Sequence, residues 1–317
     1  MRFLLLLVVM LCGLIGRGVA DEPPRRADLV IRRAAGKSEI VIRTTSRLAG
    51  AIHSLTWNGQ EFIDSADHGR QLQSASSFSS GGEHWAEAFN PTESGSRDDG
   101  AGLKSTSRLL HSRSTLDSLQ TTTQMAFWLA PGQKSEGHPA LNSTKLSNHL
   151  LTKRVQIGLP ELPHVIRYDV TFTVPIDERH TFAQFESLTG YMPAVFRSFW
   201  TFRPQTGELQ PLDDGPGEQS FPILFSTESG SHAIGIYSPQ QPPPGFEKAG
   251  YGRWRFTPER VVKWNSVFRL RLAAGIEPGE FTFRNFVVVG DRETVRTSLV
   301  DLHRRFNNSE VGIRKAE

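Results

Sequence analysis

The sequence predicts a mostly β protein, an antiparallel β-sandwich with one C-terminal α-helix. Many short runs of β-branched and aromatic residues are separated by Gly and Pro, which is typical of antiparallel sheets and not of alternating β-α units. The clearest strand signal is residues 164–174, where apolar side chains such as Tyr168 and Phe172 alternate with polar ones. Near the N-terminus, Asn58-Gly59 can close a two-residue hairpin, because both residues tolerate positive φ.

The individual elements follow from hydrophobic period and turn residues. Strands are expected at 28–33, 39–44, 120–129, 164–174, 181–188, 195–203, 221–226, 232–238, 253–257, 261–273 and 280–289. A helix is expected over 291–306, because Asp291 can cap it and apolar residues recur at helical spacing from Val295 to Phe306. Residues 307–317 form a polar tail.

The N-terminal segment 1–20 is interpreted as a secretory signal peptide. Arg2 precedes an apolar run, and small residues up to Ala20 offer a cleavage site. A signal anchor is the alternative, although the run is shorter than the ~20 apolar residues of a membrane span. We expect a mature chain that begins at Asp21, with 21–306 forming one domain, in a secreted or periplasmic protein without stable membrane insertion.

Composition excludes several kinds of site. Cys12 is the one cysteine and lies in the predicted signal, so the mature chain would have no disulfide and no thiolate ligand or nucleophile. The formal net charge is +3 and no basic cluster stands out, so nucleic acid is not expected as a partner. No His-x-His, His-Glu-x-x-His or Asp-rich calcium motif occurs, so no metal or cofactor is expected.

Two short stretches resemble a known family. Residues 50–64, around the Asn58-Gly59 turn, look like the opening hairpin of the galactose mutarotase-like supersandwich. Residues 276–283, with Pro278-Gly279, resemble the turn that leads into the last strand of aldose-epimerase-type proteins. The resemblance implies a β-supersandwich and an oligosaccharide or polysaccharide ligand on its concave face.

The segment 64–118 holds thirteen Ser and six Gly in its 55 residues. Ordered domains rarely carry so long a loop unless it binds something, so we favour a folded binding loop over disorder. His68 and Arg70 open the segment, and the resemblance implies that an arginine here hydrogen-bonds a sugar hydroxyl. The alternative is that Arg70 forms a structural ion pair with Asp64 or Asp67.

Trp85, Asn90 and Glu93 are the other candidate substrate-binding residues of this segment. An indole can stack on the C–H face of a sugar while amide and carboxylate groups bind its hydroxyls. The alternative is that the Asn-Pro-Thr-Glu run is only a turn. The tryptophans Trp200, Trp254 and Trp264 lie in strand-like runs and are interpreted as core or groove walls; the alternative is a ligand-binding role.

Glu186, Tyr191 and His149 are the candidate catalytic residues. Glu186 lies on a strand-like run, which holds a carboxylate better than a loop does, and Tyr191 follows shortly after it. Aldose epimerases use a His acid and a Glu base, and Asn148-His149 matches the first two positions of one of their motifs but lacks the aromatic and amide that follow. The alternatives are a surface or turn histidine and an ion-paired strand glutamate.

These observations lead to one leading function and one rival. The leading hypothesis is an exported carbohydrate-active protein that binds a glycan and processes it, as a glycoside hydrolase or a polysaccharide lyase. The rival is a non-catalytic glycan-binding protein with the same fold. Both require the named polar residues to converge on one surface, and we expect the set Arg70, Trp85, Asn90, Glu93, Glu186 and Tyr191 to do so.

Overall fold

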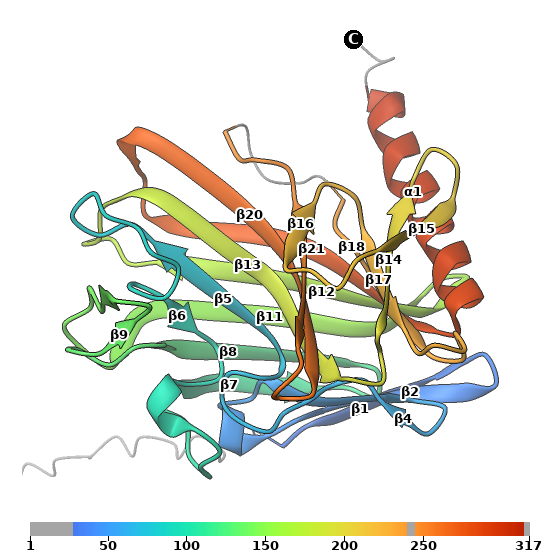
Figure 1. Cartoon of the computed structure of the whole chain (residues 1–317), viewed down its shortest axis with the longest axis horizontal. Coiled ribbons are helices and arrows are strands. Elements are labelled where there is room, and N and C mark those ends of the chain that lie inside the picture. The colour runs from blue at the N-terminus through green and yellow to red at the C-terminus, as the bar shows by residue number, and fades with distance from the viewer. Residues whose placement is uncertain (1–27, 240–244, 314–317) are drawn as a thin grey trace, which may run out of the picture.

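The computed structural model describes residues 28–239 and 245–313 and confirms a mostly antiparallel β-fold with one C-terminal helix. The predicted signal peptide and the end of the polar tail lie outside these residues. Pairing joins nineteen strands into one continuous sheet, whose two arms pack face to face as a sandwich (Figure 1). No helix in the described part of the chain has both the length and the apolar character that a bilayer crossing requires.

One arm of the sheet is built around the long central strands of the chain. In spatial order it contains β7 (Arg108–Ser114), β8 (Ser118–Phe127), β11 (Leu146–Leu159), β12 (Leu162–Val174), β21 (Gly279–Gly290), β18 (Ala233–Tyr237), β17 (Ile223–Ser226), β14 (Ser198–Arg203) and β15 (Glu208–Leu212).

The other arm carries the residues that form the site described below. Its strands are β1 (Val30–Ala35), β2 (Ser38–Thr44), β3 (Ile52–Trp57) with its hairpin partner β4 (Gln60–Glu61), β5 (Leu72–Phe78), β13 (His180–Pro193), β20 (Val261–Ile276), β19 (Gly250–Phe256) and β16 (Gly217–Gln219). Five short elements lie in the connections. Strand β6 (Pro91–Thr92) joins the arms by pairing with β5 and β8. The others are the β9 (Lys134–Ser135) and β10 (His138–Pro139) pair and the 3₁₀ turns η1 (Ser46–Leu48) and η2 (Arg97–Asp99).

The core between the arms is rich in phenylalanine. Phe172 from β12 and Phe283 from β21 meet Phe185 from β13, with ring centroids 5.1 and 5.2 Å from Phe185. On β12 the predicted alternation is confirmed, since Tyr168, Val170 and Phe172 are buried while Asp169 and Thr171 between them are partly exposed. Burial of these large aromatic rings supplies much of the driving force that holds the arms together.

The predicted hairpin is confirmed in detail. Asn58 and Gly59 have φ of 50° and 77°, as a tight two-residue turn requires. The turn joins β3 to β4, and Trp57 and Phe62 on its two sides are both buried in the core. The turn therefore fixes the register between β3 and β4, the two strands that precede β5.

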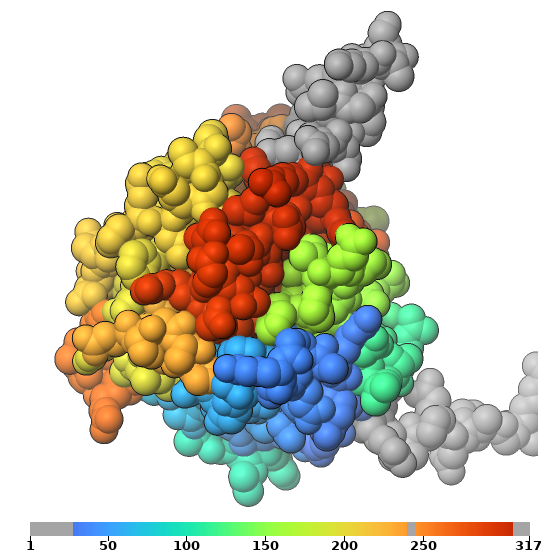
Figure 2. Space-filling view, turned by 90° about the vertical axis from the view of Figure 1, so that its right-hand side faces the viewer, coloured from blue at the N-terminus to red at the C-terminus, as the bar shows by residue number. Residues whose placement is uncertain are grey.

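Helix α1 spans Arg292–Ile313, which is longer than the predicted 291–306. Asp291 accepts a hydrogen bond from the backbone N–H of Thr294 at 2.8 Å and so caps its start, as expected. Val295 and Leu299 are fully buried against β12, β18 and β21 and form a second, smaller core on the outside of the first arm. Figure 2 shows the helix, in red, lying across this face of the molecule.

Strand β11 was not predicted, and its buried face explains why. Ser147, His149 and Lys153 alternate with outward residues on this strand but are buried, so polar side chains occupy positions where an apolar alternation was sought. The Ser-rich segment also differs from a long binding loop. It contains β5, which pairs with β13 and holds its serines Ser74 and Ser76 in the interior.

Candidate functional site: a polar cleft floored by Glu186 and Lys263

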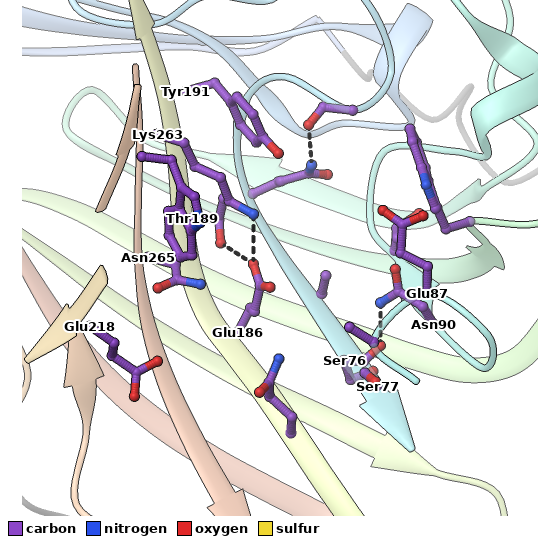
Figure 3. Close-up of a pocket in the computed structure, with 18 of the residues that line it drawn as sticks. Ser76, Ser77, Glu87, Asn90, Glu186, Thr189, Tyr191, Glu218, Lys263 and Asn265 are labelled. Carbon is purple, nitrogen blue, oxygen red and sulfur yellow. Dashed lines mark hydrogen bonds and ion pairs between the residues drawn. The ribbon is translucent and has the colours of Figure 1, made fainter. Parts of the chain in front are cut away.

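A cleft of about 330 Å³ lies on the face of the second arm that points away from the core. Its orientation follows from strand alternation, since Phe185 is buried in the core whereas Gln184 and Glu186 point to the other side. Strands β5, β13, β19 and β20 supply most of its lining, and the loop before β6 supplies one wall (Figure 3). The side chains that matter below are Gln73, Glu87, Asn90, Trp128, Gln184, Glu186, Thr189, Tyr191, Glu218, Trp254, Lys263, Asn265 and Arg269.

A β-bulge in β13 brings three of these side chains together. The pairing of β13 with β20 and with β5 shifts register just after Glu186. Without the shift, Glu186 and Thr189 would point to opposite faces, because side chains alternate along a strand. With it, Thr189 and Tyr191 line the cleft together with Glu186, and the Thr189 hydroxyl donates to Glu186 Oε2 at 2.5 Å.

Lys263 on β20 is the cation of the cleft floor. Its Nζ lies 3.6 Å from Glu186 Oε2 and sits over two aromatic rings, 5.2 Å from the centroid of Tyr191 and 5.0 Å from that of Trp254. Burial alone would lower the pKa of Lys263, but the charge of Glu186 and the neighbouring Tyr191 outweigh it and raise that pKa. Lys263 is therefore an ammonium group at neutral pH, held by an ion pair and by cation–π contacts.

Glu186 is ionised for the complementary reason. Burial raises the pKa of a carboxyl group, but Lys263 and the hydrogen bonds from Thr189 and Asn265 stabilise the charged form, and the net pKa of Glu186 lies below its ordinary value. Its side chain is 22% exposed, so one side of the carboxylate faces the cleft. At neutral pH such a carboxylate can act as a base or nucleophile or accept hydrogen bonds from a ligand, and it has no proton to give.

Two tryptophans form aromatic walls, and each lies against a glycine. A Cβ at Gly252 would be 2.2 Å from the Trp254 ring, and a Cβ at Gly69 would be 2.9 Å from the Trp128 ring. The missing side chains let each indole lie close to the neighbouring backbone. Both indoles remain partly exposed, which suits stacking on the C–H face of a sugar ring.

The opposite wall is polar. Figure 3 shows Glu87 and Asn90 across the pocket from Glu186, and the Asn90 amide is oriented by donating to the Ser76 carbonyl at 2.5 Å. At the other end of the cleft, Glu218 and Arg269 form a two-pronged ion pair with two 2.8 Å bonds. The lining thus carries three carboxylates and two cations.

Three of the predicted site residues, Asn90, Glu186 and Tyr191, meet in this cleft. Arg70 does not line it, because its guanidinium is 3.1 Å from Asp67 and 3.8 Å from Asp64, which is the structural ion pair considered as the alternative. His68 is buried, with its ring nitrogens 2.7 and 2.8 Å from the carbonyl oxygens of Gly100 and Arg47. It joins two loops and is inaccessible to a ligand.

Glu93 and Trp85 also lie outside the cleft. Glu93 is fully buried and forms an ion pair with the equally buried Lys153, so the expectation that it meets substrate is corrected. Trp85 stacks on His138 at 4.0 Å and lines a separate, neighbouring hollow. The physical reason is that residues close in this segment of the sequence alternate between the core, the cleft wall and the outer surface.

His149 is buried in the interior and is not part of the cleft. Its Nε2 lies 2.7 Å from Glu178 Oε2, and burial, which outweighs this contact, lowers the pKa of His149. The epimerase-like pairing of His149 with Glu186 is therefore not present. Lys263 and Trp128 were not among the candidates, because the pairing of β20 with β13 and the packing of Trp128 on Gly69 are not visible in the sequence.

Comparisons with known proteins bear on the fold. No protein-family model matches the sequence, and the search of curated proteins returned no match. Solved structures do match: the alpha-galactosidase from Lactobacillus brevis at 8% identity, Slr1438 from Synechocystis at 11% and the heparan sulfate lyase HepC from Pedobacter heparinus at 9%. The TM-scores are 0.42, 0.42 and 0.41, and the matches cover 83–84% of this chain.

The share of the matched protein differs between these structures. This chain spans 40% of the alpha-galactosidase and 36% of HepC, but 96% of Slr1438. Because each TM-score is below 0.5, the function proposed next rests on the geometry of the cleft.

Proposed function

We propose that the cleft binds a neutral oligosaccharide or polysaccharide and hydrolyses it, with Glu186 as the ionised carboxylate. The observation that carries this is the floor of the cleft, where Lys263 and Thr189 hold a charged, partly exposed Glu186 beside the aromatic walls. Sugars need stacking surfaces and many hydrogen-bonding groups, and this lining supplies both.

The charge balance supports a neutral glycan over a polyuronate. The two cations of the cleft are each engaged by a carboxylate, Lys263 by Glu186 and Arg269 by Glu218. Glu87 adds a further carboxylate to the lining. A uronate would have to displace one of these ion pairs and would meet an unfavourable negative potential, whereas hydroxyl groups can bind to the paired groups as they stand.

Glycoside hydrolysis needs two carboxyl groups on opposite sides of the scissile bond. Glu186 would serve as nucleophile or base, since its low pKa keeps it charged. Glu87 is the carboxyl group across the cleft and would serve as the acid that protonates the leaving oxygen. Tyr191 and Asn90 would hold the sugar between them.

The test is a panel of neutral polysaccharides and polyuronates, scored for retention and for released reducing ends. We expect a neutral glycan to be retained and cleaved, Glu186→Gln to lose turnover while keeping binding, and Glu39→Gln, an exposed glutamate on β2, to behave as the parent. Cleavage by Glu186→Gln at the parental rate, or a preference for polyuronates, would contradict the proposal.

The rival function, glycan binding without turnover, is favoured by one observation. The Glu186 carboxylate is already engaged by Thr189 and Lys263, as an ion pair in a purely structural role would be. Under this alternative the same panel shows retention with no reducing ends from any substrate, and Glu186→Gln weakens retention.

Export is part of the proposal as well. The predicted signal peptide, residues 1–20, lies outside the described residues, so its sequence pattern is the support for it. N-terminal sequencing of protein recovered outside the cytoplasm should begin at Asp21. Exported protein that still carries the apolar run after Arg2 would instead be a membrane-anchored form.

A further inference from the structure

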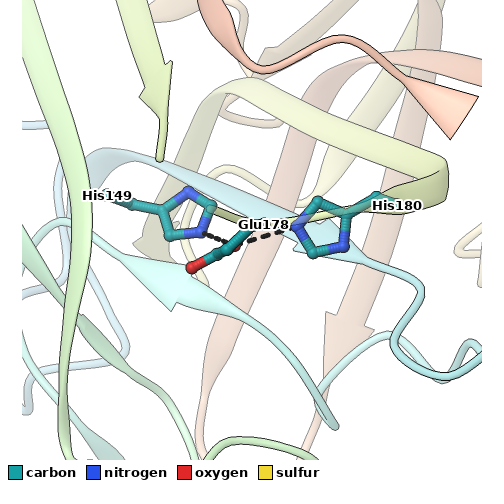
Figure 4. A group of neighbouring side chains, drawn as sticks. All are labelled: His149, Glu178 and His180. Atoms are coloured by element: carbon teal, nitrogen blue, oxygen red, sulfur yellow. Dashed lines mark hydrogen bonds and ion pairs between the residues drawn. The ribbon is translucent and has the colours of Figure 1, made fainter. Parts of the chain in front are cut away.

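A second group of ionisable side chains lies in the interior, outside the cleft. His149, Glu178 and His180 bring one ligand atom each to within 4.8 Å of one another (Figure 4). His149 comes from β11, at the position where its pairing with β8 shifts register, and such bulges re-aim side chains. Glu178 lies in the turn between β12 and β13, and His180 begins β13. The proposed hydrolysis uses none of the three.

The two imidazoles and the carboxylate of this cluster do not form a complete set of hydrogen bonds. Both imidazoles direct Nε2 at the same oxygen, Glu178 Oε2, at 2.7 Å from His149 and 2.9 Å from His180. The Nδ1 of His180 lies 2.6 Å from the carbonyl oxygen of Ser79, which can only accept, so this nitrogen carries a proton. In the neutral ring Nε2 of His180 is then a bare lone pair facing a carboxylate oxygen. Such a contact needs either a proton or a metal ion between the two atoms.

The Glu178 carboxylate lies between the two rings, with one oxygen within hydrogen-bonding distance of both. The two rings are fixed from the other side by Phe78, whose centroid is 4.6 Å from that of His180 and 4.9 Å from that of His149. The three donor atoms are therefore held in place by packing, as a metal site requires.

We propose that His149, Glu178 and His180 bind a Zn²⁺ ion. Two imidazole nitrogens and one carboxylate oxygen are a donor set that zinc takes, whereas Ca²⁺ and Mg²⁺ prefer oxygen ligands alone. Bonds of about 2.0–2.1 Å in a tetrahedral site place ligand atoms about 3.3 Å apart. The three ligand atoms now lie within 4.8 Å of one another, so closure on the ion needs a shift of these side chains, including an outward rotation of the partly exposed Glu178.

Metal binding also accounts for the proton on each imidazole ring. Each imidazole binds the ion through an unprotonated Nε2 and keeps its proton on Nδ1, which for His180 preserves the bond to Ser79. Any proton on either Nε2 leaves to solvent, and a water fills the fourth position. The ion would tie the bulge of β11 to the turn that leads into β13, the strand that carries Glu186. Its role in this position is to stabilise the sandwich.

The test is zinc binding by the full-length protein after dialysis against a chelator. We expect one Zn²⁺ per chain by calorimetric titration, a higher Tm with zinc, and no rise with Ca²⁺ or Mg²⁺. Co²⁺ in place of zinc should give the visible absorption of a tetrahedral site. Absence of stoichiometric zinc binding and of a Tm shift would overturn the proposal.

Glu178→Gln is the informative variant because it should fold. Its amide can donate to the bare Nε2 of His180, so the chelated variant should be as stable as the chelated parent, while zinc affinity falls at least 10-fold. His84→Asn is the matched control, since His84 hydrogen-bonds Ser77 on the other face of β5 and should bind zinc as the parent does. Parental affinity in Glu178→Gln, or loss of binding in His84→Asn, would place the ion elsewhere and refute the assignment.

Discussion

The buried ion pair between Lys153 and Glu93 gives a prediction whose size follows from the structure. Both side chains are 0% exposed, and Lys153 Nζ also donates to the carbonyl oxygen of Gly50 at 3.0 Å. Glu93 accepts a further bond from the backbone N–H of Ser74 at 3.2 Å. Removal of one charge leaves the other buried without a counter-charge, which costs about 3–5 kcal/mol.

Glu93→Gln and Lys153→Met should therefore each lower the free energy of unfolding by about 3–5 kcal/mol. The double variant removes both charges, and its glutamine oxygen can still accept the N–H of Ser74. It leaves the Gly50 carbonyl and the glutamine amide unpaired, which costs about 1–3 kcal/mol for each group. Because no uncompensated charge remains, the double variant should lose less stability than the sum of the two single losses.

Urea unfolding measures all three variants, with Glu39→Gln as a surface control expected within about 0.5 kcal/mol of the parent. If Glu93→Gln unfolded like the parent, Glu93 would not be the buried counter-charge described above. A double variant that loses the full sum of the two single losses would show that the two charges do not interact, and would also refute the reasoning.

Three further predictions concern the cleft and the hairpin. Because the pKa of Glu186 is lowered, turnover should be complete above the ordinary carboxyl range and fall only as pH drops through that lowered pKa. Lys263→Met leaves burial dominant, so the acid limb of the pH profile of turnover should move to higher pH. Gly252→Ala should displace Trp254 and weaken glycan binding measured by titration, while a parental affinity would show that the indole is not part of the site. Gly59→Val should cost about 1 kcal/mol or more in thermal or urea unfolding, because a β-branched residue resists the observed φ of 77°, and an unchanged stability would contradict this.

Much of the fold could be predicted because local signals agreed with the final structure. The Asn58-Gly59 turn requires positive φ, and from Ile166 to Val174 the alternation on β12 matches the observed burial. Strand β11 was not predicted because its inward face carries the polar residues His149 and Lys153. Their partners, Glu178 and Glu93, come from segments distant in the sequence. Buried polar networks break the binary pattern on which strand prediction depends.

The cleft could be predicted only in part. Glu186 and Tyr191 were found because they share a strand, but a bulge that the sequence does not reveal brings them to the same face. In the sequence, Lys263 looks like any polar residue on the outward face of a strand. Only the pairing of β20 with β13 places it beside Glu186. Glu93 was misplaced because its neighbours in sequence point in different directions.

A comparison of two tryptophans in one binding measurement tests most directly whether the glycan binds in the cleft. A neutral oligosaccharide identified by the panel is titrated into the parent, Trp254→Ala and Trp85→Ala. Trp254 forms a wall of the cleft, whereas Trp85 lines the neighbouring hollow. Loss of the aromatic contact at Trp254 should cost about 0.5–1.5 kcal/mol beyond the buried area, so affinity should fall roughly tenfold or more. We expect Trp254→Ala to bind more weakly than the parent and Trp85→Ala to bind as the parent does. The opposite pattern would place the glycan outside the cleft and contradict the proposed function.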